Sequence, residues 1–267
     1  KMMTLYIVFD MLDSGRVTYD GATMVYNLAG VEQALGRPAA AESLYRASLA
    51  MYESIPGIDP GEIAIGWGQL GILLGQQGRN AEELELQGRV VALLRTRGGR
   101  ERSLAIALSN YATSLTELGR LAEAEALHRE AVALLERGDP DDSALGGLLQ
   151  PFAVSLLYAG HLAEAESVAR RSYRLAAEEY GAANPNALVA QRALLNVLVD
   201  AGRCPEVLER SRTVIGLRGT GLSETDLTLG SAYLTLGQCL ASTGDLAGGE
   251  RAVREALTLR LATLPPD

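Results

Sequence analysis

The chain has 267 residues and a formal net charge of −9, from 24 Lys and Arg against 33 Asp and Glu. A hydrophobic fraction of 48% excludes intrinsic disorder, because such a chain can bury a large apolar surface. The acidic balance argues against a protein whose main task is to neutralise nucleic-acid phosphates or an anionic membrane surface. Aromatic residues are only 5%, and the apolar residues are mainly Ala and Leu, which favour helices over strands. We therefore expect an all-α fold.

Residues 1–15 are expected to form a short apolar N-terminal helix, at about residues 2–13, and a connection to the rest of the chain. The apolar run that begins at Leu5 is too short to cross a bilayer, and Asp10 interrupts it. No small-residue cleavage site follows, so the run does not resemble a signal peptide. These features predict a cytoplasmic protein without a membrane partner. The chain begins with Lys1 rather than Met, which indicates a segment of a longer protein.

One short pattern, a turn glycine followed by an Ala- and Glu-rich stretch, occurs six times. The turn glycines are Gly36, Gly78, Gly119, Gly160, Gly202 and Gly244. Their spacing of about 42 residues lies within the period range of solenoids. Residues 16–267 are therefore predicted to form an array of six helix-turn-helix repeats.

Each repeat has apolar residues at helical spacing on both sides of its glycine. In the third repeat, Leu108, Ala112 and Leu115 precede the glycine and Leu121 and Ala124 follow it at intervals of three or four. The glycine supplies a left-handed backbone that ends the first helix and returns the second helix antiparallel to it. Between repeats, Asp-Pro and Asn-Pro pairs at residues 59–60 and 184–185 are typical of helix starts.

Small residues are expected where the two helices of a repeat approach each other. Seven positions before the turn glycine stand Ala29, Gly71, Ala112, Ala153, Leu195 and Gly237. Five positions after it stand Ala41, Glu83, Ala124, Ala165, Val207 and Gly249. Because Glu83, Leu195 and Val207 are larger, we expect the second and fifth repeats to be the least regular.

Two stretches carry a family resemblance. The sequence from Leu108 to His128, with Leu-x-Asn-Tyr-Ala before Leu-Gly-Arg-Leu-Ala-Glu-Ala-Glu-Ala-Leu-His, resembles a tetratricopeptide repeat, as does the stretch from Tyr26 to Tyr45. The period near 42 is similar to the kinesin-light-chain subtype, which is common in bacterial signalling proteins. The resemblance covers about residues 17–264. It implies a right-handed superhelical solenoid of about six antiparallel helix pairs, whose first helices line a concave groove for a peptide or a partner helix.

If the first helices line a groove, polar residues on their outer columns are the candidate ligand contacts. These are Asn27, Gln69, Ser109, Asn110, Thr113, Gln150, Arg192, Asn196 and Gln238. A side-chain amide can both donate to and accept from the backbone of a ligand, so Asn27, Gln69, Asn110 and Asn196 are expected to set its register. Only Arg192 is basic, which argues against a clamp for a C-terminal dicarboxylate. The alternative is that all these residues are simply solvated helix positions.

No catalytic residue, metal site or cofactor is predicted. His128 falls at a packing position of a second helix, and His161 takes a turn position that elsewhere holds Arg or Asp. Four glutamates are interpreted as solvated helix faces: Glu123, Glu125, Glu164 and Glu166. No phosphate-binding glycine loop, metalloprotease motif or nucleophile elbow is present.

Two further groups of residues are given structural roles. Cys204 and Cys239 are too few for a disulfide framework and have no metal-site spacing, so both are interpreted as small apolar packing residues. The basic cluster Arg95, Arg97, Arg100 and Arg102 is interpreted as a solvated linker between repeats, with an acidic-partner or phosphate contact as the alternative. It lacks the aromatic residues that stack on single-stranded bases, so no nucleic-acid partner is predicted.

The sequence therefore predicts a non-catalytic scaffold that binds a protein or peptide ligand. One alternative is a regulatory or sensor domain of a larger signalling enzyme, such as a protein kinase or protease. Another is a structural spacer or self-association module. The last helix is expected to expose an apolar face with Leu257, Leu259 and Leu261, which would favour a homo-oligomer through the C-terminal repeat.

Overall fold

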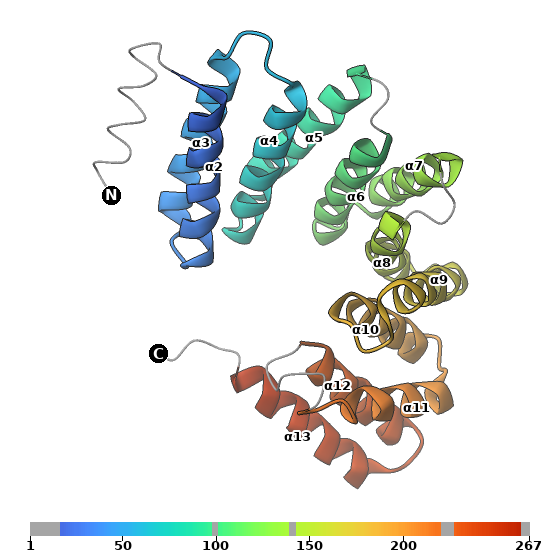
Figure 1. The fold of residues 1–267 in the computed structure, drawn as a ribbon. Helices are drawn as coiled ribbons and strands as arrows, with labels where there is room; N and C mark the ends of the chain where they lie inside the picture. Colours follow the sequence, from blue (N-terminus) through green and yellow to red (C-terminus); the bar gives the residue numbers. More distant parts are fainter. Residues whose placement is uncertain (1–16, 98–100, 139–142, 220–226, 263–267) are drawn as a thin grey trace. The chain divides into compact units, whose positions relative to one another are not determined.

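The computed structural model describes residues 17–97, 101–138, 143–219 and 227–262 (Figure 1). These residues form twelve α-helices and no β-strand, which confirms the all-α prediction. The N-terminal helix predicted at about residues 2–13 lies outside the described residues. No described helix is both long and apolar enough to cross a membrane.

The helices follow one another as six pairs, one for each turn glycine, and form an α-helical repeat solenoid. They are α2 (Tyr19–Ala34) and α3 (Pro38–Ser54), α4 (Pro60–Gln76) and α5 (Asn80–Arg97), α6 (Glu101–Glu117) and α7 (Leu121–Gly138), α8 (Ser143–Tyr158) and α9 (Leu162–Tyr180), α10 (Pro185–Asp200) and α11 (Cys204–Ile215), and α12 (Leu227–Ser242) and α13 (Leu246–Ala262). The chain divides into two compact units, Lys1–Leu118 with α2 to α6 and Gly119–Asp267 with α7 to α13. Figure 1 shows paired helices, such as α2 and α3, side by side within a unit.

The turn glycines end the first helices as predicted. All six have a positive φ, between +68° at Gly36 and +98° at Gly244, a backbone conformation that L-residues with a side chain adopt only at a cost. After α2, the backbone N–H of Gly36 donates to the Gln33 carbonyl and that of Arg37 donates to the Glu32 carbonyl. These bonds pair carbonyl groups that the helix end would otherwise leave free.

The predicted helix starts are also confirmed. Asp59 accepts a hydrogen bond from the backbone N–H of Gly61 at 2.8 Å, and Asn184 accepts one from Asn186 at 3.0 Å. A proline follows each cap at the start of its helix. The linker interpretation of the basic cluster is wrong for Arg95, Arg97 and Arg102, because α5 extends to Arg97 and α6 begins at Glu101, and Arg100 lies outside the described residues.

Within each unit, the two columns of small residues lie where the helices of a pair meet. Their alanines are fully buried, as in Ala29 and Ala41, and so are Leu195 and Val207. In the last pair, a Cβ added to Gly249 would lie 2.9 Å from the Gly237 carbonyl oxygen, so the α12 and α13 backbones need glycine to approach so closely.

Glu83 departs from the small-residue rule because α4 leaves space for it. Its side chain is buried opposite Gly75, where even a methyl group would collide with the carboxylate. The Ser114 hydroxyl of α6 donates a hydrogen bond to this carboxylate. Burial raises the pKa of Glu83, and the Ser114 bond only partly opposes that shift.

The interpretation of the two cysteines as separate packing residues is wrong, because they form a disulfide. Cys204 begins α11 and Cys239 lies in the last turn of α12, with the Cα atoms 5.3 Å apart. This distance lies within the range for a disulfide. The residues are 35 positions apart in the sequence, and the repeat register brings the start of one second helix beside the end of the next first helix. Counting cysteines does not reveal such a pairing.

Candidate functional site: a cleft between first helices

A cleft in the first unit lies between the first helices α4 and α6, with α5 behind them. We call it the α4–α6 cleft, and its volume is about 280 Å³. Its lining residues are Gly61, Ala64, Ile65, Gly68, Gln69 and Ile72 of α4, Gln87, Val90 and Leu94 of α5, and Ser103, Ile106, Ala107 and Asn110 of α6. No charged residue is among them.

The hollow follows from the composition of α4. Gly61 and Gly68 have no side chains to fill the space between the helices, whereas Ile65, Ile72 and Ile106 form apolar walls. These isoleucines remain 53%, 36% and 41% exposed. Large apolar side chains held open to solvent around a preformed hollow are typical of a binding surface.

Three side-chain amides add hydrogen-bonding groups to this apolar cleft. Gln69 is half-buried and Asn110 is exposed, and neither side chain forms a hydrogen bond with a described residue. Gln87 lies deeper and is only 2% exposed. It packs under Gly71, where an added Cβ would lie 3.4 Å from its Nε2 atom.

A second cleft with the same construction occurs in the second unit. The α8–α10 cleft has a volume of about 320 Å³ and is lined by Gly146, Gly147 and Gln150 of α8, Ala176 and Tyr180 of α9, and Asn186, Val189 and Ala190 of α10. Ile106 and Val189 occupy the same position relative to their turn glycines, as do Leu94 and Ala176. The repeat itself therefore generates the cleft.

The structure brings only part of the predicted groove together. Gln69 of α4 and Asn110 of α6 both line the α4–α6 cleft, and Gln150 lines the α8–α10 cleft. The other candidates line neither cleft: Asn27, Asn196 and Gln238 are exposed, Thr113 and Arg192 are half-buried, and Ser109 is buried. Burial removes Ser109 from any surface, and the Thr113 hydroxyl is already used, since it donates to the Ser109 carbonyl at 2.9 Å.

Gln87 was not predicted because it lies on a second helix, whereas all the candidate ligand contacts were on first helices. A signal was present in the column nine positions after the turn glycine. This column holds Tyr45, Gln87, His128, Ala169, Ser211 and Val253. A polar residue in a column that is buried in most repeats marks a buried hydrogen-bonding group.

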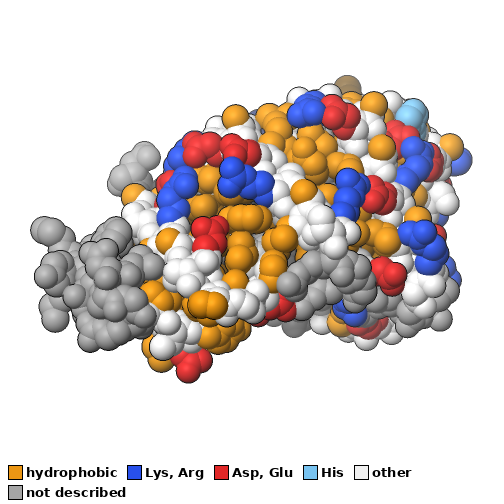
Figure 2. All heavy atoms as spheres, turned by 90° about the horizontal axis from the view of Figure 1, so that it is seen from above, with side chains coloured by type: hydrophobic (Ala, Val, Ile, Leu, Met, Phe, Trp, Pro, Cys, Tyr) orange, Lys and Arg blue, Asp and Glu red, His pale blue; other side chains and the backbone are white. Residues whose placement is uncertain are grey.

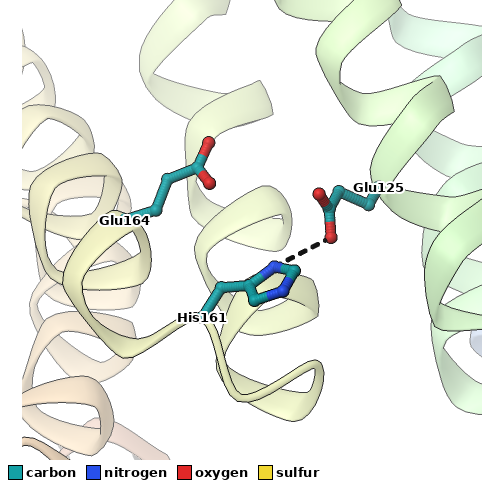
Figure 3. A group of neighbouring side chains, drawn as sticks. All are labelled: Glu125, His161 and Glu164. Carbon is teal, nitrogen blue, oxygen red and sulfur yellow. Dashed lines mark ion pairs between the residues drawn. The ribbon is translucent and has the colours of Figure 1, made fainter.

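Glu125, His161 and Glu164 form a group that resembles a metal site. One potential ligand atom of each lies within 4.8 Å of the others, and Figure 3 shows all three side chains pointing into one space. However, His161 Nδ1 is 3.1 Å from Glu125 Oε2, and the Arg129 guanidinium pairs with both carboxylates, at 2.9 Å from Glu164. The guanidinium supplies the positive charge that these carboxylates need, so the geometry fits an ion-pair cluster better than a metal centre.

The same cluster occurs in two other places, and each copy joins a repeat to the one that follows it. We call it the inter-repeat clasp. A glutamate and an arginine of one second helix pair with two residues of the following repeat, which are the residue directly after the turn glycine and a glutamate three positions further on. Its three copies are Glu42 and Arg46 with Arg79 and Glu82, Glu125 and Arg129 with His161 and Glu164, and Glu166 and Arg170 with Arg203 and Glu206. On the face drawn in Figure 2, groups of basic and acidic side chains lie next to one another.

The interpretation of Glu125 and Glu166 as solvated is wrong, because both side chains are shielded within clasps. The side chains of Glu125 and Glu166 are only 13% and 17% exposed. The hydrogen bonds of Arg170 lower the pKa of Glu206 to about 2, and the Arg170 bond also lowers the pKa of Glu166. Glu166 and Glu206 are therefore structural groups that are held ionised, and Glu125 is a shielded member of its clasp.

His128 is a core residue, as predicted. Its side chain is 1% exposed and stacks on Phe152 at 5.5 Å between ring centroids. Neither ring nitrogen has a hydrogen-bond partner among the described residues. Burial lowers the pKa of His128 to about 4, so the ring is neutral near pH 7.

The chain consists of helix pairs that repeat along the sequence and pack on their neighbours. Proteins built in this way form the class of α-helical repeat solenoids. The tetratricopeptide repeat family matches residues 21–96 and 62–137. Residues 21–137 therefore match tetratricopeptide repeats, and the fold of the chain is similar to that of kinesin-light-chain repeats. None of the curated proteins matches this sequence.

Solved structures share this fold at low sequence identity. The nearly identical TPR-like repeats of a kinesin light chain homologue from Podosopora anserina are 17% identical, with 78% of this chain and 99% of that chain covered and a TM-score of 0.65. BtubC (BKLC) from P. vanneervenii is 18% identical, with 100% and 94% covered and a TM-score of 0.55. A Rap protein complexed with Competence and Sporulation Factor is 14% identical, with 95% and 78% covered and a TM-score of 0.67.

Proposed function

We propose that this protein is a non-catalytic interaction scaffold that binds an extended peptide or a partner helix along its first helices. Tetratricopeptide repeats are protein-interaction modules in general, and one relative in fold, the Rap protein, is complexed with Competence and Sporulation Factor. The observation that carries the proposal is the α4–α6 cleft, a preformed hollow with apolar walls and amide groups that have no partner among the described residues.

The cleft offers two kinds of contact to a ligand chain. Ile65, Ile72 and Ile106 would bury apolar side chains of the ligand, which supplies most of the binding free energy. Gln69 and Asn110 would donate to and accept from its backbone, which sets the register. Because the helices are already packed, little ordering entropy of the protein opposes binding.

The lining also restricts the ligand. Neither cleft contains a charged residue, so neither provides the cationic groups that a desolvated carboxylate needs. A neutral segment therefore fits these clefts better than an acidic tail.

Selection from a phage-displayed peptide library, followed by fluorescence anisotropy with the enriched peptides, tests this function. Ile65→Glu places a charge on the cleft wall and is expected to weaken binding at least tenfold, because a desolvated charge is costly. Leu35→Glu is the matched control, since Leu35 is 57% exposed outside both clefts and Gln77 occupies the same position in the second repeat. If both variants bind every selected peptide like the wild type, binding in the α4–α6 cleft is wrong.

Self-association is the second candidate, and α13 carries the observation in its favour. Leu257 and Leu261 are each 57% exposed, and Leu246 is 70% exposed. Leu259 is 4% exposed, so the expectation that it belongs to the apolar surface is wrong. Sedimentation equilibrium compares the wild type with a Leu257→Glu, Leu261→Glu double variant. A wild type that is monomeric at all concentrations would contradict self-association through this face.

A further inference from the structure

Gln87 lines the α4–α6 cleft, and its side-chain amide has no hydrogen-bond partner among the described residues. The side chain is 2% exposed. The amide atoms keep some solvent contact, since the fully buried side-chain nitrogen and oxygen atoms without a partner among the described residues are those of His128. The residue lines the cleft, so a group entering the cleft can reach the amide.

We propose that the α4–α6 cleft is a specificity pocket for a glutamine side chain of a neutral peptide ligand, with Gln87 as the residue that recognises it. This inference rests on the proposed function and adds the identity of the side chain that enters the cleft. The carboxamide of the ligand would pair with the carboxamide of Gln87, one N–H to one C=O in each direction. The two methylene groups of the ligand glutamine would lie against the isoleucine walls.

The complementarity of the two groups favours glutamine over other side chains. Gln87 presents a donor and an acceptor on separate atoms, and a primary carboxamide satisfies both at once. A tyrosine or serine hydroxyl has a single oxygen with which to serve both roles. Charged side chains are disfavoured because no described lining residue can neutralise them. Asparagine is one methylene shorter, so its amide would reach less far towards Gln87, which is only 2% exposed.

The α8–α10 cleft provides an internal control. At the position that corresponds to Gln87, nine residues after the turn glycine, its second helix holds Ala169, which is fully buried and does not line that cleft. The two clefts share their register, but only the α4–α6 cleft has a buried amide at this position. Gln150 and Asn186 also line the α8–α10 cleft, but neither is buried, so the stronger selectivity for a carboxamide is expected in the α4–α6 cleft.

Side-chain analogues test the proposal without knowledge of the natural ligand. The probes are propionamide for glutamine, acetamide for asparagine, p-cresol for tyrosine, and 2-butanone, which has the shape of propionamide but no N–H. Binding is followed by NMR through the side-chain NH₂ signals of Gln87 and the methyl signals of Ile65 and Ile106, with Val189 as the reporter of the second cleft. We expect propionamide to bind the α4–α6 cleft about three- to tenfold more tightly than 2-butanone, the value of one or two neutral hydrogen bonds.

A Gln87→Met variant keeps the size of the side chain and removes both hydrogen-bonding groups. It is expected to abolish the preference for propionamide over 2-butanone and to leave the response of Val189 unchanged. The wild-type preference and the shift of the Gln87 NH₂ signals test the proposal even if this variant does not fold.

Two results would overturn the inference. One is equal binding of propionamide and 2-butanone, which would mean that Gln87 is satisfied by solvent alone. The other is tighter binding of p-cresol or acetamide than of propionamide. Either result leaves the proposed function intact if library peptides still lose affinity with Ile65→Glu, so the failure of the two proposals can be distinguished.

Discussion

The buried histidine predicts that the second unit loses stability in mild acid. His128 has a folded-state pKa near 4 because its ring is buried and unpaired, whereas an exposed histidine has a pKa of 6.5. As the pH falls below 6.5, the unfolded chain binds a proton that the folded chain does not bind. The unfolded state is therefore favoured, and the penalty grows until the pH reaches about 4.

The magnitude follows from the two pKa values. Between pH 8 and pH 5, linkage predicts a loss of about 2 kcal/mol in the free energy of unfolding from this group. Most carboxylates keep their charge in this interval, so the histidine is expected to dominate the change.

Urea denaturation followed by circular dichroism at pH 8 and pH 5 measures this loss in the wild type and in His128→Leu. Leucine keeps an apolar contact with Phe152 and cannot titrate, so the variant should lack the loss of about 2 kcal/mol. The pKa of His128 is measured directly from its ring proton signals during an NMR titration. An NMR pKa near 6.5, or the same pH dependence in both proteins, would refute the reasoning.

Three other predictions concern single elements of the fold. Reduction of the Cys204–Cys239 disulfide should lower the free energy of unfolding by about 3 to 4 kcal/mol, measured by urea denaturation with and without reductant. A Cys204→Ser variant should not respond to reductant, and two free thiols in the oxidised wild type would contradict the pairing. Arg170→Ala should lower the free energy of unfolding by about 1 kcal/mol because it breaks the clasp to Glu206. The control Arg254→Ala removes an exposed ion pair within one helix and should cost less than about 0.5 kcal/mol. Equal effects would show that the clasp adds nothing. Gly119→Val should cost about 2 kcal/mol because of the positive φ, and an unchanged melting temperature would exclude that cost.

Much of the architecture was predictable because it depends on local chemistry that repeats. The turn glycines need a left-handed backbone that only glycine adopts easily, so each one marks the end of a first helix wherever it occurs. The caps at Asp59 and Asn184 are decided by the hydrogen bond of one side chain to a backbone N–H two residues further on. The burial of His128 followed from its place on an apolar stripe.

The candidate site was predictable only in part. Gln69 and Asn110 were expected on a groove because both lie in a polar column of first helices, and they do line one cleft. Ser109 lies next to Asn110 in the sequence and is buried instead, since a rotation of 100° about the helix axis turns it towards the core. The contribution of glycine was also hidden, because an absent side chain creates a hollow only when the neighbouring helices leave it unfilled.

The sequence alone determined the repeat, its period, the helix ends at the turn glycines, the helix starts after Asp59 and Asn184, and the all-α class, since each depends on residues close together in the chain. Only the tertiary structure decided which side chains from different repeats meet. It paired Cys204 with Cys239, shielded Glu125 and Glu166 within clasps, and placed Gln87 without a partner in the α4–α6 cleft. These outcomes depend on the distances between elements about one repeat apart, and composition and helical periodicity carry no information about such distances.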